Sequence, residues 1–169
     1  PPGTDVPYPP RTANLHHEIE LVVAIGRSGA SIAVELALGH VFGYAVGNDL
    51  TRRDLQAQAK KAGAPWDMAK GFDASAPVSA IRSAAEIGHV GRGRIWLAVN
   101  GVLRQQADVG EMIWSVPEII AELSGYCRLE PGDLIFTGTP PGVGPLVAGD
   151  VVTGGIDGVG TLEHRVFTA

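Results

Sequence analysis

The 169-residue sequence has one cysteine, no long apolar run and no large basic cluster, and each lack argues against a class of protein. Cys127 has no partner for an internal disulfide, which fits a reducing cytoplasm. No stretch approaches the roughly 18 apolar residues of a transmembrane helix, and no charged start followed by an apolar core marks a secretion signal. We therefore predict a cytoplasmic protein in which Cys127 is structural rather than nucleophilic.

Basic side chains are too few for binding to nucleic acid or to an anionic membrane. The sequence has 13 Lys and Arg against 18 Asp and Glu, a formal net charge of −5, and its only adjacent basic pairs are Arg52–Arg53 and Lys60–Lys61. The hydrophobic content of 45% supplies the core of one domain. The expected partners are small molecules and further copies of the chain.

Two acidic residues interrupt the apolar run at residues 15–26. Glu18 and Glu20 are two residues apart, so in a strand they lie on the same face, roughly 7 Å apart along the backbone. Burying two carboxylates costs several kcal/mol per ion unless a partner compensates them. The pair therefore indicates either a bound cation or an edge strand whose polar face is solvated.

A third acidic residue, Asp49, follows a strand-like run and precedes a helix. Thr51 and Asp54 resemble a capping box for that helix, and Gly63 is expected to end it. With Glu18 and Glu20, Asp49 completes a set of hard oxygen ligands suited to Mg²⁺, Mn²⁺ or Ca²⁺.

The histidine doublet beside Glu18 leaves an alternative open. In a strand, His16 shares a face with Glu18 and Glu20, and a site that included it would favour zinc or iron. His17 lies on the opposite face, and we expect it to bond a backbone group inside the core. The sequence gives no role to His40, His89 or His164.

Elsewhere the sequence predicts short strands and a few helices. Helices are expected at residues 31–38, ending at Gly39, and at residues 115–124, where Ser115 and Glu118 form a capping box and Gly125 is the stop.

Turn signals place the remaining strands. Asn100-Gly101 predicts a type I′ hairpin of residues 94–99 with 102–106, and Glu130-Pro131-Gly132-Asp133 predicts a type II turn before a strand at 134–137. Further strands are expected at 151–153 and 162–167. The fold class is therefore α+β and rich in strands, in one domain at residues 15–169 after a proline-rich lead-in, residues 1–14, that can form neither a helix nor a central strand.

Four blocks in order, residues 17–21, 43–56, 65–73 and 132–140, resemble the fumarylacetoacetate hydrolase family. The resemblance implies a mixed β-sandwich roll of the type of that family's C-terminal domain. It implies that Glu18, Glu20 and Asp49 hold Mg²⁺ or Mn²⁺ and that Lys70 is catalytic. It also implies that Gln56, Gly138 and Thr139 bind and orient the substrate.

Residues 8–10, the His16–His17 doublet and the loop at residues 140–145 are similar to the acylpyruvase and fumarylpyruvate hydrolase branch of that family. This implies hydrolysis of a carbon–carbon bond in a 2,4-dioxo acid in aromatic catabolism, with fumarylpyruvate giving fumarate and pyruvate through a metal-bound enolate. It also implies a homodimer. The alternatives are an oxaloacetate decarboxylase, or a hydratase or enol–keto isomerase of a 2-oxo acid.

Members of the family carry a lid helix, before the point that corresponds to Pro1, whose His and Glu form an acid/base pair. Nothing in the sequence matches that pair. Either such a segment precedes Pro1 in the gene product, or it is lacking. In the second case the chain is a metal-stabilised binding domain or a subunit that borrows residues from another.

Overall fold

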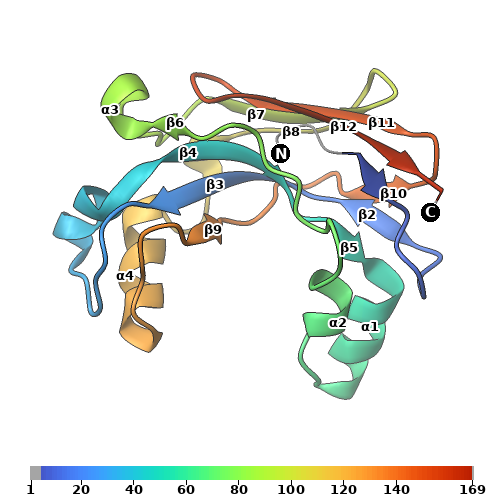
Figure 1. Cartoon of the computed structure of the whole chain (residues 1–169), viewed down its shortest axis with the longest axis horizontal. Coiled ribbons are helices and arrows are strands. Elements are labelled where there is room, and N and C mark those ends of the chain that lie inside the picture. Colours follow the sequence, from blue (N-terminus) through green and yellow to red (C-terminus); the bar gives the residue numbers. More distant parts are fainter. Residues whose placement is uncertain (1–4, 169) are drawn as a thin grey trace.

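The structure, a computed structural model, describes residues 5–168, so the first four residues of the proline-rich lead-in lie outside it. Strands are the dominant element, and the predicted strand-rich α+β class is confirmed. Two layers of sheet are stacked, and the helices at residues 53–62, 67–70 and 116–126 lie below the lower layer at its two ends (Figure 1).

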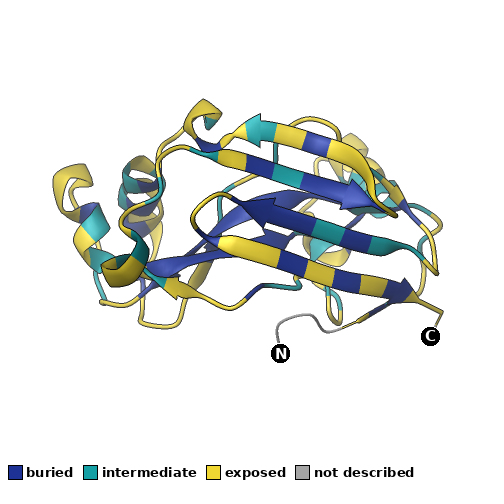
Figure 2. Ribbon diagram, turned by 90° about the horizontal axis from the view of Figure 1, so that it is seen from above, coloured by how far each residue is buried: buried dark blue, intermediate teal, exposed yellow. Residues whose placement is uncertain are grey.

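The upper layer is a five-stranded sheet in the order β1-β12-β11-β7-β8. In β12 buried and exposed residues alternate (Figure 2), as expected where one face covers a core and the other faces solvent. The strands are β1 (Val6–Pro7), β7 (Arg94–Val99), β8 (Val102–Asp108), β11 (Val151–Ile156) and β12 (Gly160–Phe167). Pro7 is on an edge strand, the position in a sheet that tolerates proline.

The lower layer holds the two segments that carry Glu18, Glu20 and Asp49. A four-stranded sheet has the order β6-β4-β3-β9, and a three-stranded sheet has the order β10-β2-β5. The first contains β3 (Ile19–Ile25), β4 (Val41–Asn48), β6 (Arg82–Ser83) and β9 (Leu134–Phe136), and the second contains β2 (Leu15–His17), β5 (Thr51–Arg52) and β10 (Gly144–Leu146). Every residue of β3 is buried, because β4 and β9 flank it and Ile19, Leu21 and Val23 belong to the main hydrophobic core.

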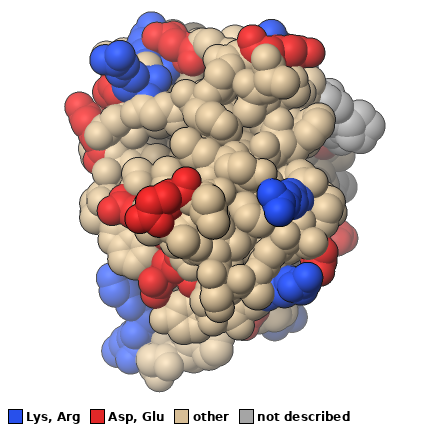
Figure 3. Space-filling model, turned by 90° about the vertical axis from the view of Figure 1, so that its left-hand side faces the viewer, with Lys and Arg blue, Asp and Glu red and all other residues tan. Residues whose placement is uncertain are grey.

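The helices are short. They are α1 (Arg53–Ala62), α2 (Asp67–Lys70), α3 (Ala84–Ile87), α4 (Val116–Tyr126) and two 3₁₀ helices, η1 (Val34–His40) and η2 (Val109–Glu111). No helix among residues 5–168 has the length and apolar character needed to cross a membrane. The face shown in Figure 3 carries acidic and basic side chains in small, scattered groups.

Both predicted turns are confirmed. Asn100 and Gly101 have φ values of 51° and 77° and join β7 to β8, as a type I′ hairpin requires. The Asp133 amide donates to the Glu130 carbonyl at 3.1 Å, and Gly132 has a φ of 100° immediately before β9.

Two helix boundaries differ from the prediction. The helix expected at residues 31–38 is a 3₁₀ helix that begins at Val34 and runs past Gly39, because α4 accepts the backbone N–H groups of Ser31 and Ile32. The α4 helix begins with the predicted Ser115–Glu118 capping box but continues through Gly125 to Tyr126. It ends at an extended and exposed Cys127, just before Leu129 pairs with Gly29.

The capping box predicted at Thr51 and Asp54 is wrong. Thr51 is buried in β5, and its hydroxyl donates to the Asp49 carbonyl at 3.0 Å. The Asp54 carboxylate instead accepts from the Thr12 hydroxyl at 2.6 Å and from the Ala13 amide at 3.1 Å, so it ties the lead-in to α1. The predicted end of α1 is confirmed, since Gly63 follows Ala62 with a φ of 62°.

His164 on β12 gives a first testable prediction. Its side chain is buried, its Nε2 accepts from Asn48 Nδ2 at 3.0 Å, and burial lowers its pKa to about 4. Between pH 6.5 and 4 the unfolded chain therefore binds a proton that the folded chain does not, so this group lowers the free energy of unfolding by roughly 3 kcal/mol as the pH falls through that window. Chemical denaturation across this range should show that the free energy of unfolding falls less steeply with decreasing pH in His164→Gln than in the wild type.

The matched control for this experiment is Thr161→Ala, a substitution at an exposed position of the same strand that carries no ionisable group. It is expected to leave the pH dependence of unfolding unchanged. Equal pH dependence in the wild type and in His164→Gln would show that His164 does not titrate in this way.

Candidate metal centre

Three acidic side chains converge where β3 and β4 meet. Glu18 occupies the single residue between β2 and β3, Glu20 is the second residue of β3, and Asp49 directly follows β4. The antiparallel pairing of Ile19 with Asn48 brings the acidic ends of the two strands together. One oxygen atom from each carboxylate lies within 4.8 Å of the others, as a shared cation requires.

The site is largely enclosed. Glu18 and Glu20 are 7% and 3% exposed, and Asp49 is half-buried. The alternative of a solvated edge strand is therefore wrong for this pair, because β3 is a central strand whose carboxylates are withdrawn from water. Glu20 has one protein donor, the Gly138 amide at 2.7 Å from its Oε2.

Two cations compensate part of this negative charge. Lys70 at the end of α2 donates from Nζ to Glu18 Oε2 at 2.9 Å and also contacts Asp49 Oδ2. Arg53 at the start of α1 contacts Glu18 Oε1 through Nη2. Two positive side chains thus face three carboxylates, so the cluster lacks one positive charge for neutrality when all three carboxylates are ionised.

The three carboxyl groups have different proton affinities. Burial raises the pKa of Glu20 to about 7, and the charges of Asp49 and Glu18 add to the shift, which the Gly138 amide only partly opposes. Burial also raises the pKa of Asp49. Burial acts in the same direction on Glu18, but hydrogen bonds and charges from Lys70 and Arg53 outweigh it, so the pKa of Glu18 is lowered.

This donor set fits a hard divalent cation. The ligand atoms are carboxylate oxygens held close together, and the raised pKa of Glu20 reports mainly the cost of burying its charge, to which the two neighbouring carboxylates add. Mg²⁺ and Mn²⁺ prefer such ligands.

His16 is outside the cluster. Its Nε2 bonds Asn14 Oδ1 at 2.9 Å, and its Nδ1 accepts from Arg53 Nε at 3.4 Å. Within residues 5–168 the cluster is therefore made only of carboxylates, which gives no support to the zinc or iron alternative. His17 is buried as predicted, but its partner is the side chain of Gln105 at 2.8 Å and not a backbone group.

The three residues predicted to bind substrate occupy different positions around the cluster. Gln56 on α1 accepts from Arg53, the residue that contacts Glu18. Gly138 contacts Glu20 through its amide. The Thr139 hydroxyl donates to the Ile19 carbonyl and accepts from Gln105 Nε2, both at 2.8 Å, so it is engaged within the protein.

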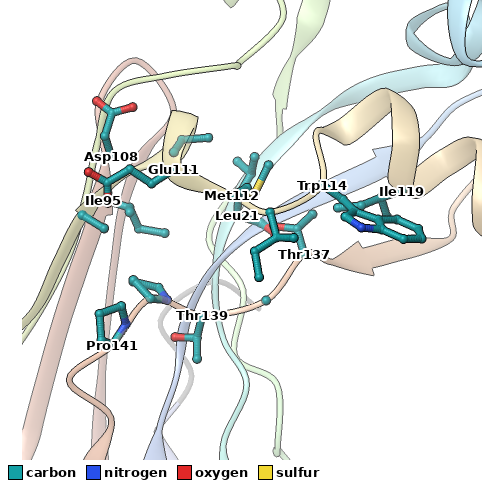
Figure 4. Close-up of a pocket in the computed structure, with 15 residues that line it drawn as sticks. Leu21, Ile95, Asp108, Glu111, Met112, Trp114, Ile119, Thr137, Thr139 and Pro141 are labelled. Carbon is teal, nitrogen blue, oxygen red and sulfur yellow. The ribbon is translucent and has the colours of Figure 1, made fainter.

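The Thr137–Thr139 loop also borders a cavity of about 500 Å³ (Figure 4). Its walls are mostly apolar, and the charged residues along them are Asp108 and Glu111. The Asp108 carboxylate accepts from the Gly93 and Gly110 amides, so the cavity is a largely apolar space beside the carboxylate cluster. The loop that donates to Glu20 is thus shared by the carboxylate cluster and this cavity.

Sequence reasoning missed three residues at this site. In the sequence Arg53 is 35 residues from its partner Glu18, and Gln105 is 86 residues from its partner Ile19. No local pattern marks either residue. Asn48 accepts from the Glu18 amide at 2.8 Å through Oδ1, and its place beside Asp49 was the only available signal.

Comparison with known proteins finds one family and several relatives that match nearly the whole chain. The family described as fumarylacetoacetate (FAA) hydrolase C-terminal matches residues 1–167. A fumarylpyruvate hydrolase of Ralstonia is 47% identical over 167 residues, which cover 99% of this chain and 86% of the relative. A mitochondrial oxaloacetate tautomerase of Mus musculus is 46% identical over 166 residues, 98% of this chain and 75% of the relative.

A solved structure is also similar. The fumarylpyruvate hydrolase of Pseudomonas aeruginosa, in complex with Mn²⁺ and pyruvate, superposes with a TM-score of 0.97 at 47% identity. The match covers 99% of this chain and 72% of that one.

Proposed function

The chain is an enzyme of the fumarylacetoacetate hydrolase family, which includes hydrolases acting on carbon–carbon bonds, and from this premise we propose that its substrate is an acylpyruvate. The favoured reaction converts fumarylpyruvate and water to fumarate and pyruvate. The observation that carries the proposal is the buried cluster of Glu18, Glu20 and Asp49 with Lys70 against it, in a chain 47% identical to an enzyme that holds Mn²⁺ and pyruvate.

Glu18, Glu20 and Asp49 are proposed to hold Mg²⁺ or Mn²⁺. A 2-oxo acid can chelate such an ion through its oxo group and carboxylate, and the ion would supply positive charge there. The residues of the chain then decide how the substrate is placed. Gly138 contacts Glu20 and Gln56 contacts Arg53, so both lie close to where the carboxylate end of the substrate is proposed to bind.

Lys70 is proposed to be the catalytic residue. Its ammonium already contacts two of the three carboxylates, so it lies where a chelated substrate would bind. When water adds at the distal carbonyl and the C3–C4 bond breaks, the pyruvate fragment leaves with negative charge on its oxygen. An ammonium placed at that oxygen is worth about 3–4 kcal/mol of transition-state stabilisation.

The second candidate is a tautomerase or decarboxylase of oxaloacetate. It is favoured by the 46% identity to the mitochondrial oxaloacetate tautomerase. Oxaloacetate presents the same chelating 2-oxo acid end, and the same stabilised negative charge would serve enol–keto exchange. The two candidates therefore differ in what happens at C4 and not in how the metal end binds.

Product analysis on the full-length gene product with Mn²⁺ separates these candidates. The substrates are fumarylpyruvate, oxaloacetate and acetylpyruvate, the last because it lacks the distal carboxylate of fumarylpyruvate. A hydrolase should give pyruvate and the carboxylic acid in equal amounts, measured by proton NMR, and release no CO₂ in a separate CO₂ assay.

A higher kcat/KM for enol–keto exchange or for CO₂ release from oxaloacetate would contradict the hydrolase assignment. Binding of all three acids without turnover would favour the metal-stabilised binding domain instead.

We also propose a homodimer and a cytoplasmic location. Ile113 and Trp114, beside the cavity, are exposed apolar side chains of the kind that gather at interfaces between copies of a chain. The single cysteine fits a reducing compartment.

A further inference from the structure

Gln105 is a buried amide on a strand whose neighbouring side chains are exposed. It lies on β8, the edge strand of the upper sheet, with 1% of its surface exposed, whereas Arg104 and Gln106 on either side are exposed. The register of β7 with β8 shifts here, since Leu97 pairs with Gln105 and Ala98 with Leu103. Such a bulge re-aims a side chain, and here it turns Gln105 toward the lower layer.

The amide of Gln105 makes four hydrogen bonds, which use all of its conventional donors and acceptors. Oε1 accepts from the Ile19 amide at 3.2 Å and from His17 Nδ1 at 2.8 Å, and Nε2 donates to the Thr139 hydroxyl and the Pro140 carbonyl, both at 2.8 Å. A backbone N–H can only donate and a carbonyl can only accept, so these partners fix which end of the amide is oxygen. A fully satisfied buried amide of this kind is rigid.

Gln105 and Thr139 together bind both backbone groups of Ile19, the residue between Glu18 and Glu20. Gln105 accepts the Ile19 N–H, and Thr139, itself held by Gln105, donates to the Ile19 carbonyl at 2.8 Å. Both peptide groups of Ile19 are therefore held by side chains, one from the upper layer and one from the loop that follows β9. These peptide groups join Ile19 to Glu18 and to Glu20.

The chain needs such support at this point because it passes from one sheet to another. β2 pairs with β10 and β5, whereas β3 pairs with β4 and β9, and Glu18 lies in the gap between them. Side-chain amides take the two backbone N–H groups at the gap, Asn48 that of Glu18 and Gln105 that of Ile19. Without them these buried N–H groups would lose their partners.

We propose that Gln105 is a positioning residue that fixes the placement of Glu18 and Glu20 for the divalent cation, an inference that rests on the proposed metal-dependent function. It acts through Ile19 and Thr139 and does not itself belong to the carboxylate cluster. Outer partners that orient metal ligands typically contribute about 10- to 100-fold to metal affinity.

The test is Mn²⁺ affinity of the full-length protein by isothermal titration calorimetry. Gln105→Met keeps the length of the side chain but removes its donors and acceptors, and it is expected to weaken Mn²⁺ binding about 10- to 100-fold. The control of identical residue type is Gln106→Met on the exposed face of β8, which should bind Mn²⁺ within about twofold of the wild type, because an exposed polar side chain contributes little.

A second control separates positioning from general loss of stability. Val152→Ala removes core volume on β11 without contact to the cluster, so it should lower the unfolding temperature yet hold Mn²⁺ as the wild type does. If Gln105→Met does not fold, Gln105→Asn takes its place. It keeps the amide but is one methylene too short to reach both Ile19 and Pro140.

A folded Gln105 variant that binds Mn²⁺ as tightly as the wild type would overturn the proposal, and so would a loss of affinity no larger than that of Val152→Ala. Because the readout is metal binding, it does not depend on which substrate is turned over. A wild-type protein that binds Mn²⁺ but cleaves no acylpyruvate would contradict the proposed hydrolase and leave the test of Gln105 valid.

Discussion

Replacing Glu20 with glutamine is expected to weaken Mn²⁺ binding by more than about 100-fold. This exceeds the loss of about 10- to 100-fold that is typical when a residue that only orients a metal ligand is removed. The substitution removes a charged oxygen ligand from a set of three that lie within 4.8 Å of one another, while keeping the volume of the side chain. Glu18→Gln and Asp49→Asn should have comparable effects. Calorimetric titration at pH 8 measures this, because Glu20 with a pKa of about 7 is then mostly ionised in the wild type.

The same variant is expected to be more stable than the wild type in metal-free buffer. The pKa of Glu20 is raised from 4.5 to about 7 on folding, so the unfolded chain releases its proton first and stability is lost as the pH rises through that window. At pH 8 the ionised Glu20 therefore costs up to about 3 kcal/mol, and glutamine removes that cost. A gain in stability together with a loss of Mn²⁺ binding is typical of a functional site and not of a structural one.

The matched control for the ligand variants is Glu163→Gln, a substitution at an exposed position of β12. It should leave both Mn²⁺ affinity and stability near those of the wild type. Wild-type affinity in any one of the three ligand variants would remove that residue from the metal site.

Replacing Lys70 with methionine is expected to lower kcat by about 100- to 1000-fold while KM changes much less, because loss of one preorganised donor to a developing oxyanion costs that much. The interaction strengthens as negative charge develops, so it acts on the transition state more than on bound substrate. Steady-state kinetics with an acylpyruvate and saturating Mn²⁺ measure the split.

Mn²⁺ affinity separates the two roles that Lys70 could have. Its ammonium contacts Glu18 and Asp49, so its removal should leave Mn²⁺ binding unchanged or tighter, and the slower reaction then cannot be due to lost metal. Lys60→Met, at an exposed position in the last turn of α1, is the control and should keep wild-type kinetics. A raised KM with unchanged kcat would make Lys70 a residue of substrate binding only.

Local features of the fold could be predicted from the sequence where a few adjacent residues decide the backbone conformation. Asn100-Gly101 selects a type I′ turn in any context, and Ser115 with Glu118 caps a helix through contacts three residues apart. Predictions failed where a distant segment competed for the same groups. Asp54 has the position of a capping residue, but Thr12 and Ala13 occupy its carboxylate.

The sequence by itself determined the proposed ligand set. Carboxylates two residues apart in an apolar run must share a face of a strand, Asp49 at a predicted strand end completes the set, and the resemblance to a hydrolase family added Lys70. Only the tertiary structure decided the surroundings that make this set a site. The Arg53 contact with Glu18, the Gln105 and Thr139 bonds to Ile19, and the raised pKa of Glu20 depend on chain crossings of 35 to 120 residues. Residue spacing carries no information on such contacts, because burial and long-range hydrogen bonds exist only once the sheets have packed.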